Sequence, residues 1–152
     1  MTNPGRLVRV SGPANTRFSV ATHALTLLAG LPGDAQSSEV LARSIDVNPV
    51  HVRRVLGALR EAGLVTSRPG PTGGWQLAQR ADEITLADVW NAIRGDRGPL
   101  DVHQAAYACE VGQSIQAQLE DLDRDLAAAI EHELAQRTVA ELARRAPAPA
   151  AS

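Results

Sequence analysis

The chain has 152 residues, of which 44% are hydrophobic and 3% aromatic, and its formal net charge is −2; this length predicts one folded domain with at most a small appendage. Its aliphatic composition favours helices over a sheet sandwich, and the single cysteine, Cys109, excludes an internal disulfide framework and a CxxC zinc site. No apolar run is long enough for a signal peptide or a membrane span, which predicts a cytoplasmic protein without a membrane partner.

The first predicted helix follows an N-terminal tail over residues 1–13, which contains Pro and Gly but shows no periodicity. The helix begins near Asn15 or Thr16, where a side chain can cap it, and ends at the turn signal of residues 31–34. Apolar residues at helical spacing mark its buried face: Phe18, Ala21, Leu25, Leu28 and Ala29.

A second, short helix is predicted over residues 38–44, with Ser37 as its N-cap and with Val40 and Leu41 turned inward. Residues 45–47 leave room only for a tight connection to the next element. The chain is therefore expected to turn sharply here.

Asn48 and Pro49 predict the start of a third helix, because Asn is a favoured N-cap and Pro is favoured at the first helical position. Gly63 is expected to end it. Its inward residues are Val52, Val55, Leu56 and Leu59. A short helix, a tight turn and a capped helix in succession form the helix-turn-helix pattern.

A β-hairpin is predicted next, with strands over 64–67 and 75–78 joined by the Gly- and Pro-rich turn 68–74. Thr85 then opens a fourth helix through a capping-box signature, and Gly95 stops it. The inward residues of this helix are Leu86, Val89, Trp90 and Ile93. The hairpin is expected to form the wing of a winged helix-turn-helix domain.

A long helix is predicted from Gln113 onward. Its apolar residues are spaced four, three and four positions apart, as in the seam between two helices. These residues are Ile115, Leu119, Leu122 and Leu126, and Ile130 continues the apolar side. The seam predicts a homodimer. Thr138 opens a final short helix through a second capping box.

The predicted fold is mainly α with a small β-hairpin. Four segments follow the N-terminal tail. They are a winged helix-turn-helix domain over 15–98, a loop with the sole cysteine over 99–112, a dimerisation helix with a short terminal helix over 113–145, and a disordered tail over 146–152.

Candidate DNA contacts lie on the exposed side of the third predicted helix. Arg53 and Arg54, near its front, can reach guanine O6 and N7 or nearby phosphates. The alternative is a solvated face in which these arginines pair with Glu39 or Glu61. The preceding turn, the capped start and the following hairpin favour DNA binding.

The wing turn supplies further candidates. Arg68, at the shoulder of the turn, can enter a minor groove or touch a phosphate, although Gly and Pro are also what any tight turn requires. Nucleotide binding is not predicted, because the turn lacks the GxxxxGK[ST] pattern and the chain contains no Lys. The full set of candidate DNA-binding residues is Ser38, Asn48, Val50, His51, Arg53, Arg54, Arg68, Gly70, Thr72 and Gly73.

Charge is divided along the chain. Residues 36–80 carry six Arg against three acids, whereas residues 81–135 carry three Arg against twelve acids. Every cation of the chain is Arg, whose planar guanidinium suits phosphates and guanine edges. The basic segment is expected to meet a polyanion and the acidic one is not.

Cys109 stands just before the predicted long helix, where the helix dipole favours thiolate and the neighbouring Glu110 opposes it. It is either a redox sensor or an inert, buried residue that packs against the fourth helix. The four histidines lack metal-ligand spacing, and no nucleophile with a placed base is recognisable. The sequence therefore predicts no metal, no cofactor and no enzymatic activity.

Three segments together, residues 36–65, 70–78 and 83–89, resemble the Rrf2 family of transcriptional regulators, and the resemblance extends from about Asn15 to Ala143. The family implies a dimeric transcription factor with an N-terminal winged domain and a long dimerisation helix. It assigns base and phosphate contacts to the wing turn and to Asn48, Val50, Arg53 and Arg54. The family often has Arg where this chain has Pro69, so Arg68 is offset by one position.

Cluster-binding members of that family supply three cysteines before the long helix, where this chain has one, in the element Cys109-Glu-Val-Gly. The resemblance therefore implies a single-cysteine branch without an iron–sulfur cluster, and it favours thiol sensing by Cys109.

The leading hypothesis is a homodimeric repressor on an inverted-repeat operator in double-stranded DNA, responsive to a redox or small-molecule effector. The alternatives are a winged-helix module that binds only proteins and a thiol-dependent enzyme.

Overall fold

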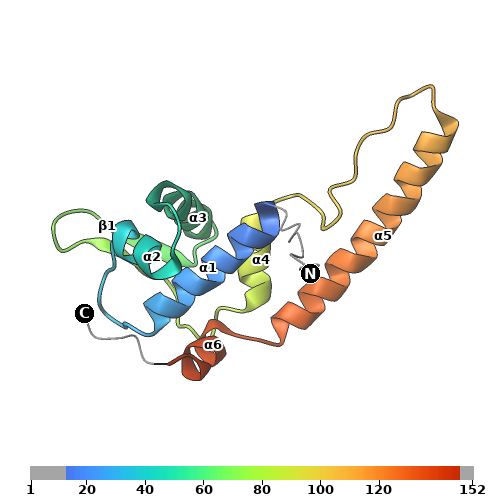
Figure 1. Ribbon diagram of the computed structural model, residues 1–152. Helices are drawn as coiled ribbons and strands as arrows, with labels where there is room; N and C mark the ends of the chain where they lie inside the picture. Colours follow the sequence, from blue (N-terminus) through green and yellow to red (C-terminus); the bar gives the residue numbers. More distant parts are fainter. Residues whose placement is uncertain (1–12, 148–152) are drawn as a thin grey trace, which may run out of the picture.

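A computed structural model describes residues 13–147 (Figure 1). Residues 1–12 of the predicted N-terminal tail and residues 148–152 of the predicted C-terminal tail lie outside the described part. The elements are α1 Pro13–Ala29, α2 Ser38–Ile45, α3 Pro49–Glu61, β1 Val65–Arg68, β2 Gly74–Leu77, α4 Leu86–Arg94, α5 Glu110–Ala135 and α6 Val139–Arg145. The fold is therefore mainly helical with one two-stranded hairpin, as predicted.

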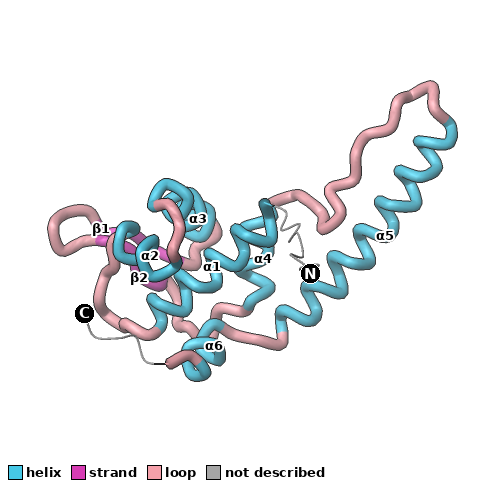
Figure 2. The backbone as a smooth tube through the Cα atoms, viewed as in Figure 1, coloured by secondary structure: helices cyan, strands magenta, loops and turns pink. Residues whose placement is uncertain are grey.

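The molecule has two parts (Figure 2). A compact head contains α1 to α4, the hairpin and α6, and the long helix α5 projects away from it, accompanied along its first half only by the loop that follows α4. We call α5 and that loop, residues 95–135, the arm. No helix of residues 13–147 is both long and apolar enough to span a membrane.

The core of the head joins the inner faces of α1, α3 and α4. The predicted inward residues of α3 are all fully buried, and those of α4 are nearly so. α1 begins at Pro13, two residues before the predicted start, because proline is well suited to the first helical turn. The buried apolar residues of the head are Val20, Ala21, Ala24, Leu25, Leu28, Leu41, Ala42, Val52, Val55, Leu56, Leu59, Leu64, Val65, Ile84, Leu86, Val89, Trp90, Ile93 and Val139.

The inward face of α2 differs from the prediction. Leu41 is buried, as expected, but Val40 is 43% exposed and the small residue Ala42 is buried in its place. This eight-residue helix is packed between α1 and α3, and their positions decide which side of it turns inward. Hydrophobicity alone cannot choose between the neighbours of Leu41.

Local side-chain chemistry builds the helix-turn-helix. The Ser37 hydroxyl caps α2 by accepting the N–H of Val40 at 3.2 Å, and the amide oxygen of Asn48 caps α3 by accepting that of Val50 at 2.8 Å. Between the helices, Asp46 adopts the left-handed conformation with φ of 60°, which Asp tolerates better than most residues. The turn is thereby completed within a few residues.

The end of α3 leads directly into the hairpin. Gly63 has φ of +74°, and the N–H groups of Gly63 and Leu64 bond to the carbonyls of Arg60 and Leu59, which is a Schellman motif. β1 and β2 are antiparallel, with Val65 opposite Leu77 and Arg68 opposite Gly74. The strands begin and end within one residue of the predicted positions.

The base of the hairpin is held against the loop before α2. The N–H and carbonyl of Trp75 pair with those of Gln36 at 2.8 and 3.0 Å, and a Cβ added to Gly74 would lie 2.6 Å from the Gln36 carbonyl oxygen. Gly74 also has φ of +141°. Only glycine fits this approach, so the wing has a fixed position relative to the helix-turn-helix.

Two capping boxes close the head. Thr85 and Asp88 cap α4, and Thr138 and Glu141 cap α6, both as predicted. Backbone bonds from Leu86 to Arg137 and from Val139 to Ile84 join the two helix starts, so the chain returns from α5 to the head. Across the core, Phe18 and Trp90 make an edge-to-face contact at 5.5 Å.

α5 begins at Glu110, three residues before the predicted start, so Cys109 is its N-cap and residues 110–112 are helical rather than loop. Cysteine is a weak acceptor that pattern-based cap rules do not include. α5 contacts α4 near its far end, where Arg94 and Glu131 form an ion pair at 3.0 Å. None of its residues is buried.

Candidate DNA-binding surface

The two sides of α3 differ sharply. Its inner side is part of the core, whereas its outer side presents Val50, Arg53 and Arg54 to solvent. Val50 is 50% exposed, and the N-cap Asn48, two residues before it, is exposed as well. The folding of α3 onto the core therefore forces its cationic front outward. This exposed front is what a helix needs to enter a major groove.

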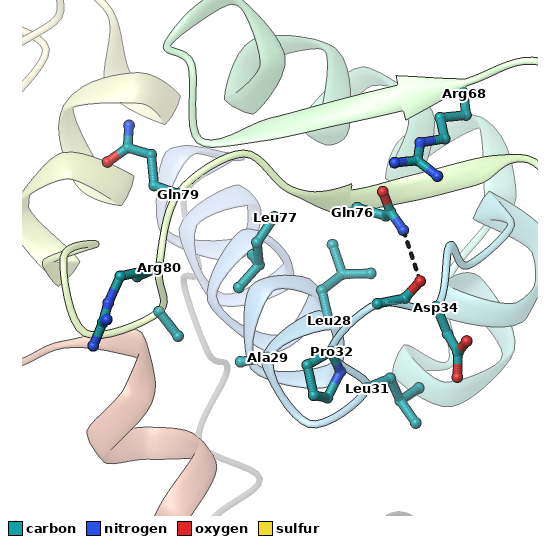
Figure 3. A pocket seen from close by; sticks show the side chains of 12 residues that line it. Leu28, Ala29, Leu31, Pro32, Asp34, Arg68, Gln76, Leu77, Gln79 and Arg80 are labelled. Carbon is teal, nitrogen blue, oxygen red and sulfur yellow. Dashed lines mark hydrogen bonds between the residues drawn. The ribbon is translucent and has the colours of Figure 1, made fainter.

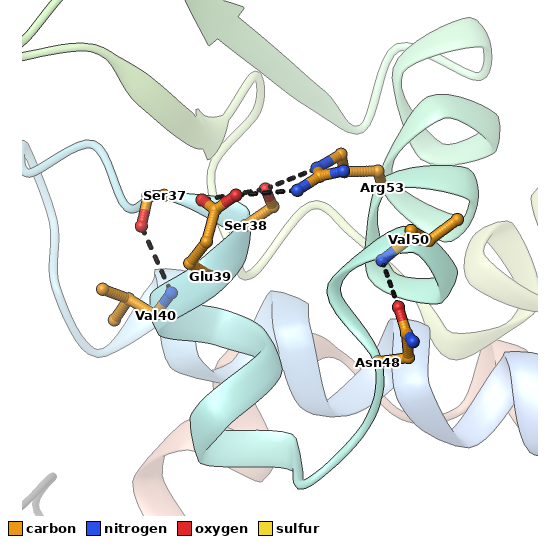
Figure 4. Close-up of polar contacts among 7 residues, drawn as sticks. All are labelled: Ser37, Ser38, Glu39, Val40, Asn48, Val50 and Arg53. Carbon is orange, nitrogen blue, oxygen red and sulfur yellow. Dashed lines mark hydrogen bonds and ion pairs between the residues drawn. The ribbon is translucent and has the colours of Figure 1, made fainter.

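Arg53 is held from one side (Figure 4). Its Nε–H donates to the Ser38 hydroxyl at 3.1 Å, and one Nη–H donates to the Glu39 carboxylate at 2.8 Å. The sequence left open a pairing of the arginines with Glu39 or Glu61, and the structure forms the Arg53–Glu39 pair. Among residues 13–147, Arg54 takes part in no ion pair. The two adjacent arginines are thus unequal.

The ion pair changes the titration of Glu39. The hydrogen bond from Arg53 stabilises the carboxylate and lowers the pKa of Glu39 below its ordinary value of 4.5. Both side chains remain about half exposed, at 50% for Arg53 and 57% for Glu39. Glu39 is therefore ionised at neutral pH and adds a negative charge to the surface that presents Arg53.

Two predicted DNA contacts are less accessible than expected. Ser38 is only 7% exposed, because it begins α2 beneath Arg53 and its hydroxyl also donates to Glu39 at 3.2 Å. His51 is half-buried, and its Nε2 is buried without a hydrogen-bond partner among residues 13–147. Ser38 belongs to α2 and His51 to the first turn of α3. The structure gives Ser38 a role in holding Arg53 rather than a surface position.

Arg60 links α3 to the wing. Its guanidinium lies 5.6 Å from the centre of the Trp75 ring and reaches the Ser67 hydroxyl at 3.5 Å. No sequence pattern pointed to this contact between α3 and the hairpin. The contact extends the basic surface from α3 onto the hairpin.

The wing turn is compact and exposed at its tip. Gly70 and Thr72 are exposed, whereas Gly73 is half-buried and its N–H closes the turn on the Gly70 carbonyl at 3.0 Å. A Cβ on Gly73 would lie 2.1 Å from the Arg68 carbonyl oxygen. Gly73 therefore shapes the turn, and Gly70 and Thr72 are the residues placed to touch a ligand.

Arg68 points to the same side of the hairpin as Gln76 (Figure 3), and the register puts both opposite to Ser67 and Trp75, the residues that Arg60 contacts. It lines a hollow of about 400 Å³ between the hairpin and the loop after α1, beside Asp34 and Gln76. The amide of Gln76 crosses this hollow and donates to the Gly33 carbonyl at 3.1 Å. Arg68 thus faces away from α3.

α5 carries an apolar row that the other described residues, within 13–147, leave largely uncovered. Ile115 is 47% exposed, Leu122 48% and Leu126 36%, which is unusual for large aliphatic side chains. The other two predicted seam residues, Leu119 and Ile130, are half-buried. They lie at the border between this row and the side of α5 that faces α4 and the loop.

Cys109 is exposed, and its Sγ accepts the N–H of Gly112 at 3.3 Å. The predicted alternative had Cys109 buried against α4, and in the structure the thiol is exposed instead. Its position at the start of α5, within reach of solvent, agrees with the predicted placement ahead of a helix start.

A helix-turn-helix followed by a glycine-anchored hairpin, with a basic outer surface on both, defines a winged helix-turn-helix protein. The Rrf2 family, described as an iron-dependent transcriptional regulator, matches residues 14–145. The chain belongs to this family of DNA-binding transcription regulators.

Individual relatives agree with that membership. YwnA of Bacillus subtilis, assigned as an HTH-type transcriptional regulator, is 33% identical over 129 residues, which cover 84% of this chain and 95% of YwnA. A crystal structure of a protein assigned as DNA-binding has a TM-score of 0.65 and 32% identity, over 83% of this chain and 97% of that one. The structure of CymR, the global cysteine regulator of B. subtilis, has a TM-score of 0.64 and 24% identity, over 87% and 96%.

The iron in the family's description does not fit the residues of this chain. Iron–sulfur clusters need about four ligands, mostly cysteine thiolates, and Cys109 is the single cysteine of the sequence. Within residues 13–147, no three His, Cys, Asp or Glu side chains gather closely enough to hold a metal ion. No step of the proposed function therefore passes through an iron centre.

Proposed function

We propose that the protein is a homodimeric repressor that binds an inverted-repeat operator through α3 and the wing turn. The observation that carries this proposal is the exposed front of α3, where Val50, Arg53 and Arg54 face solvent while the opposite side is fully buried. Asn48 and the tip residues Gly70 and Thr72 complete the surface. A repressor acts by occupying its operator. Binding through this surface is sufficient for that and needs no catalytic step.

Charge-matched variants test the DNA surface. Arg53→Ala should weaken operator binding by about 1–3 kcal/mol if a bidentate guanine contact is lost. Arg54→Ala should also weaken binding, and Arg97→Ala, which removes an exposed arginine from the arm, should leave it unchanged. Gel-shift titrations at several salt concentrations measure these effects. Equal affinities for all three variants and the wild type would refute the surface.

The row of Ile115, Leu122 and Leu126 supports the dimer. These side chains would expose a hydrophobic surface in a monomer, and a second α5 can cover them. A twofold dimer presents two copies of α3 related by symmetry, so its operator must be an inverted repeat. The half-sites are expected roughly one helical turn apart, or a multiple of it.

Thiol chemistry at Cys109 is the proposed signal. The Cys109 thiolate attacks one oxygen of hydrogen peroxide and the O–O bond breaks, giving a sulfenic acid and hydroxide; the hydroxide takes a proton from solvent to become water. Oxidation alters the sulfur that accepts the N–H of Gly112. The conformation of the first turn of α5, the proposed dimerisation helix, should therefore change. We expect the two heads to tilt and the operator to be released.

Mass spectrometry after mild peroxide treatment, together with operator binding by Cys109→Ser, tests the signal. Peroxide should add one oxygen to Cys109 and lower the operator affinity of the wild type, while the Ser variant stays bound. Release of the Ser variant by peroxide would disprove the thiol mechanism and leave the DNA-binding proposal standing.

A further inference from the structure

We propose that Ser38 and Glu39 are positioning residues that hold Arg53 for reading guanine, and that Glu39 increases sequence discrimination while reducing affinity for DNA in general. This inference rests on the proposed function, because it concerns how the same surface of α3 selects its operator. It assigns a function to two residues that lie on α2 and not on the recognition helix α3. One of them, Ser38, is buried.

The donor geometry of Arg53 supports this assignment. A guanidinium has five N–H donors in one plane. One side of that plane, formed by Nε and one Nη, is engaged by the Ser38 hydroxyl at 3.1 Å and the Glu39 carboxylate at 2.8 Å. The outer edge, which carries the remaining Nη–H groups, makes no hydrogen bond to the described residues 13–147. Two parallel donors at that edge match the O6 and N7 acceptors of guanine.

The two acceptors are themselves fixed. Ser38 is the first residue of α2 and is 7% exposed, so its hydroxyl has little freedom to move. It also donates to Glu39 at 3.2 Å, which orients the carboxylate toward Arg53 (Figure 4). α2 is anchored to the core by Leu41 and Ala42. Arg53 is therefore ordered before DNA arrives, and it does not have to give up its rotamer freedom on binding.

The charge of Glu39 has a second consequence. Its carboxylate is 57% exposed, and it neutralises Arg53 while repelling nearby phosphates. Arg53 is thus a poor partner for the DNA backbone and a suitable one for a base edge. Arg54, which takes part in no ion pair among residues 13–147, keeps its full charge for phosphates. Adjacent arginines divide base reading and backbone binding between them.

The experiment compares Glu39→Ala with Glu61→Ala, in the wild-type protein and in Arg53→Ala. Glu61 is exposed at the C-terminal end of α3, so its variant removes the same charge from the helix-turn-helix at a position that makes no ion pair with Arg53. The readouts are the ratio of dissociation constants for the selected operator and for an operator with one guanine replaced, and the dependence of binding on salt. Glu39→Gln keeps an acceptor oxygen and serves as a second variant.

In Arg53→Ala, replacing the operator guanine that Arg53 reads should no longer change the affinity. At that same guanine, Glu39→Ala should lower the ratio of dissociation constants by at least about fivefold. Its binding to random DNA should strengthen, with a salt slope steeper by about one, because the released Arg53 can neutralise a phosphate. Glu61→Ala should leave discrimination unchanged. In the Arg53→Ala background, Glu39→Ala should have no further effect on discrimination, and Glu39→Gln should retain part of the wild-type discrimination.

Equal discrimination in Glu39→Ala, Glu61→Ala and the wild type would overturn the positioning role while the operator itself remains valid. A loss that is as large in the Arg53→Ala background would show that Glu39 acts elsewhere and would overturn it too. If the wild type prefers no sequence at all, the proposed function fails first, and this inference fails with it. Thermal unfolding of each variant establishes that the compared proteins are folded.

Discussion

The head and the arm of this protein differ in how far they bury their apolar side chains. In the head, short helices and a hairpin cover one another, and the inward residues of α3 are completely buried. In the arm, the 26-residue helix α5 has no buried residue and leaves Ile115, Leu122 and Leu126 exposed. The head buries its apolar residues within one chain, whereas the arm leaves an apolar row that the proposed dimer would cover.

The head and the arm are also expected to have different roles in operator binding. The head fixes α3 and the wing turn, the proposed DNA-binding surface, relative to each other through contacts within the chain, among them the Gln36–Trp75 backbone pair and the Arg60 bridge. In the proposed dimer, the arm would set where the second head lies. Affinity of one half-site should therefore depend on the head, and the spacing between half-sites should depend on the arm.

Breaking the arm should have the largest effect. Leu122→Asp places a charge in the exposed apolar row, so the dimer should dissociate and operator binding should be lost, because one head makes only half of the contacts. Sedimentation velocity and gel shifts measure both. Ala128→Asp adds the same charge to another exposed side of α5 and should remain a dimer. A dimeric Leu122→Asp protein would disprove the seam.

A core substitution in the head should be costly in a different way. Leu59 is fully buried in α3, so Leu59→Ala should lower the free energy of unfolding by about 2–5 kcal/mol. Leu122→Ala should cost less, by an amount that varies with protein concentration because it acts through association. Urea unfolding at two concentrations separates the two behaviours. A concentration-independent loss of the same size at both positions would contradict the division into head and arm.

Glycine substitutions in the head and in the arm should give smaller changes in stability that differ between the two parts. Gly74→Ala meets the Gln36 backbone at 2.6 Å with φ of +141°, and should lower stability by roughly 1–3 kcal/mol. Gly98→Ala in the arm meets only the Asp123 carboxylate, which can rotate away, so it should cost less. Gly57→Ala, in open space inside α3, should raise stability by about 0.5–1 kcal/mol. Thermal unfolding that ranks Gly98→Ala as the most damaging would contradict this order.

The smallest effect concerns acid titration of Glu39. Because the pKa of Glu39 in the folded protein is lowered by Arg53, the stabilisation from this pair is fully present above pH 4.5 and is lost as the pH falls through the folded-state pKa. NMR titration should place the pKa of Glu39 below 4.5 in the wild type and closer to 4.5 in Arg53→Ala. An identical pKa in both proteins would show that the pair does not persist in solution.

Much of the head could be predicted because its signals are local. Ser37, Asn48, Thr85 and Thr138 cap helices through hydrogen bonds within their own first turns. Such bonds depend only on neighbouring residues, so a sequence pattern suffices to identify them. The buried faces of α1, α3 and α4 were recognisable for a similar reason, since their apolar spacing is regular.

What depends on packing between elements could not be predicted in the same way. Val40 and Ala42 are both apolar, and only the placement of α2 between α1 and α3 decides that Val40 is the exposed one. Likewise, Ser38 and Arg53 are 15 positions apart, and their hydrogen bond follows from how α2 crosses α3. The cap of α5 was missed because Cys109 is an unusual acceptor in that position.

DNA recognition by a twofold dimer can be tested by selecting the sequences that the wild-type protein binds from a random DNA pool. We expect an enriched inverted repeat whose half-sites are separated by roughly one helical turn, or a multiple of it, with a guanine in each half-site where Arg53 binds. Such a result requires both the α3 surface and a twofold dimer joined through α5. Absence of any enriched sequence, or enrichment of a single half-site without its inverted copy, would contradict it.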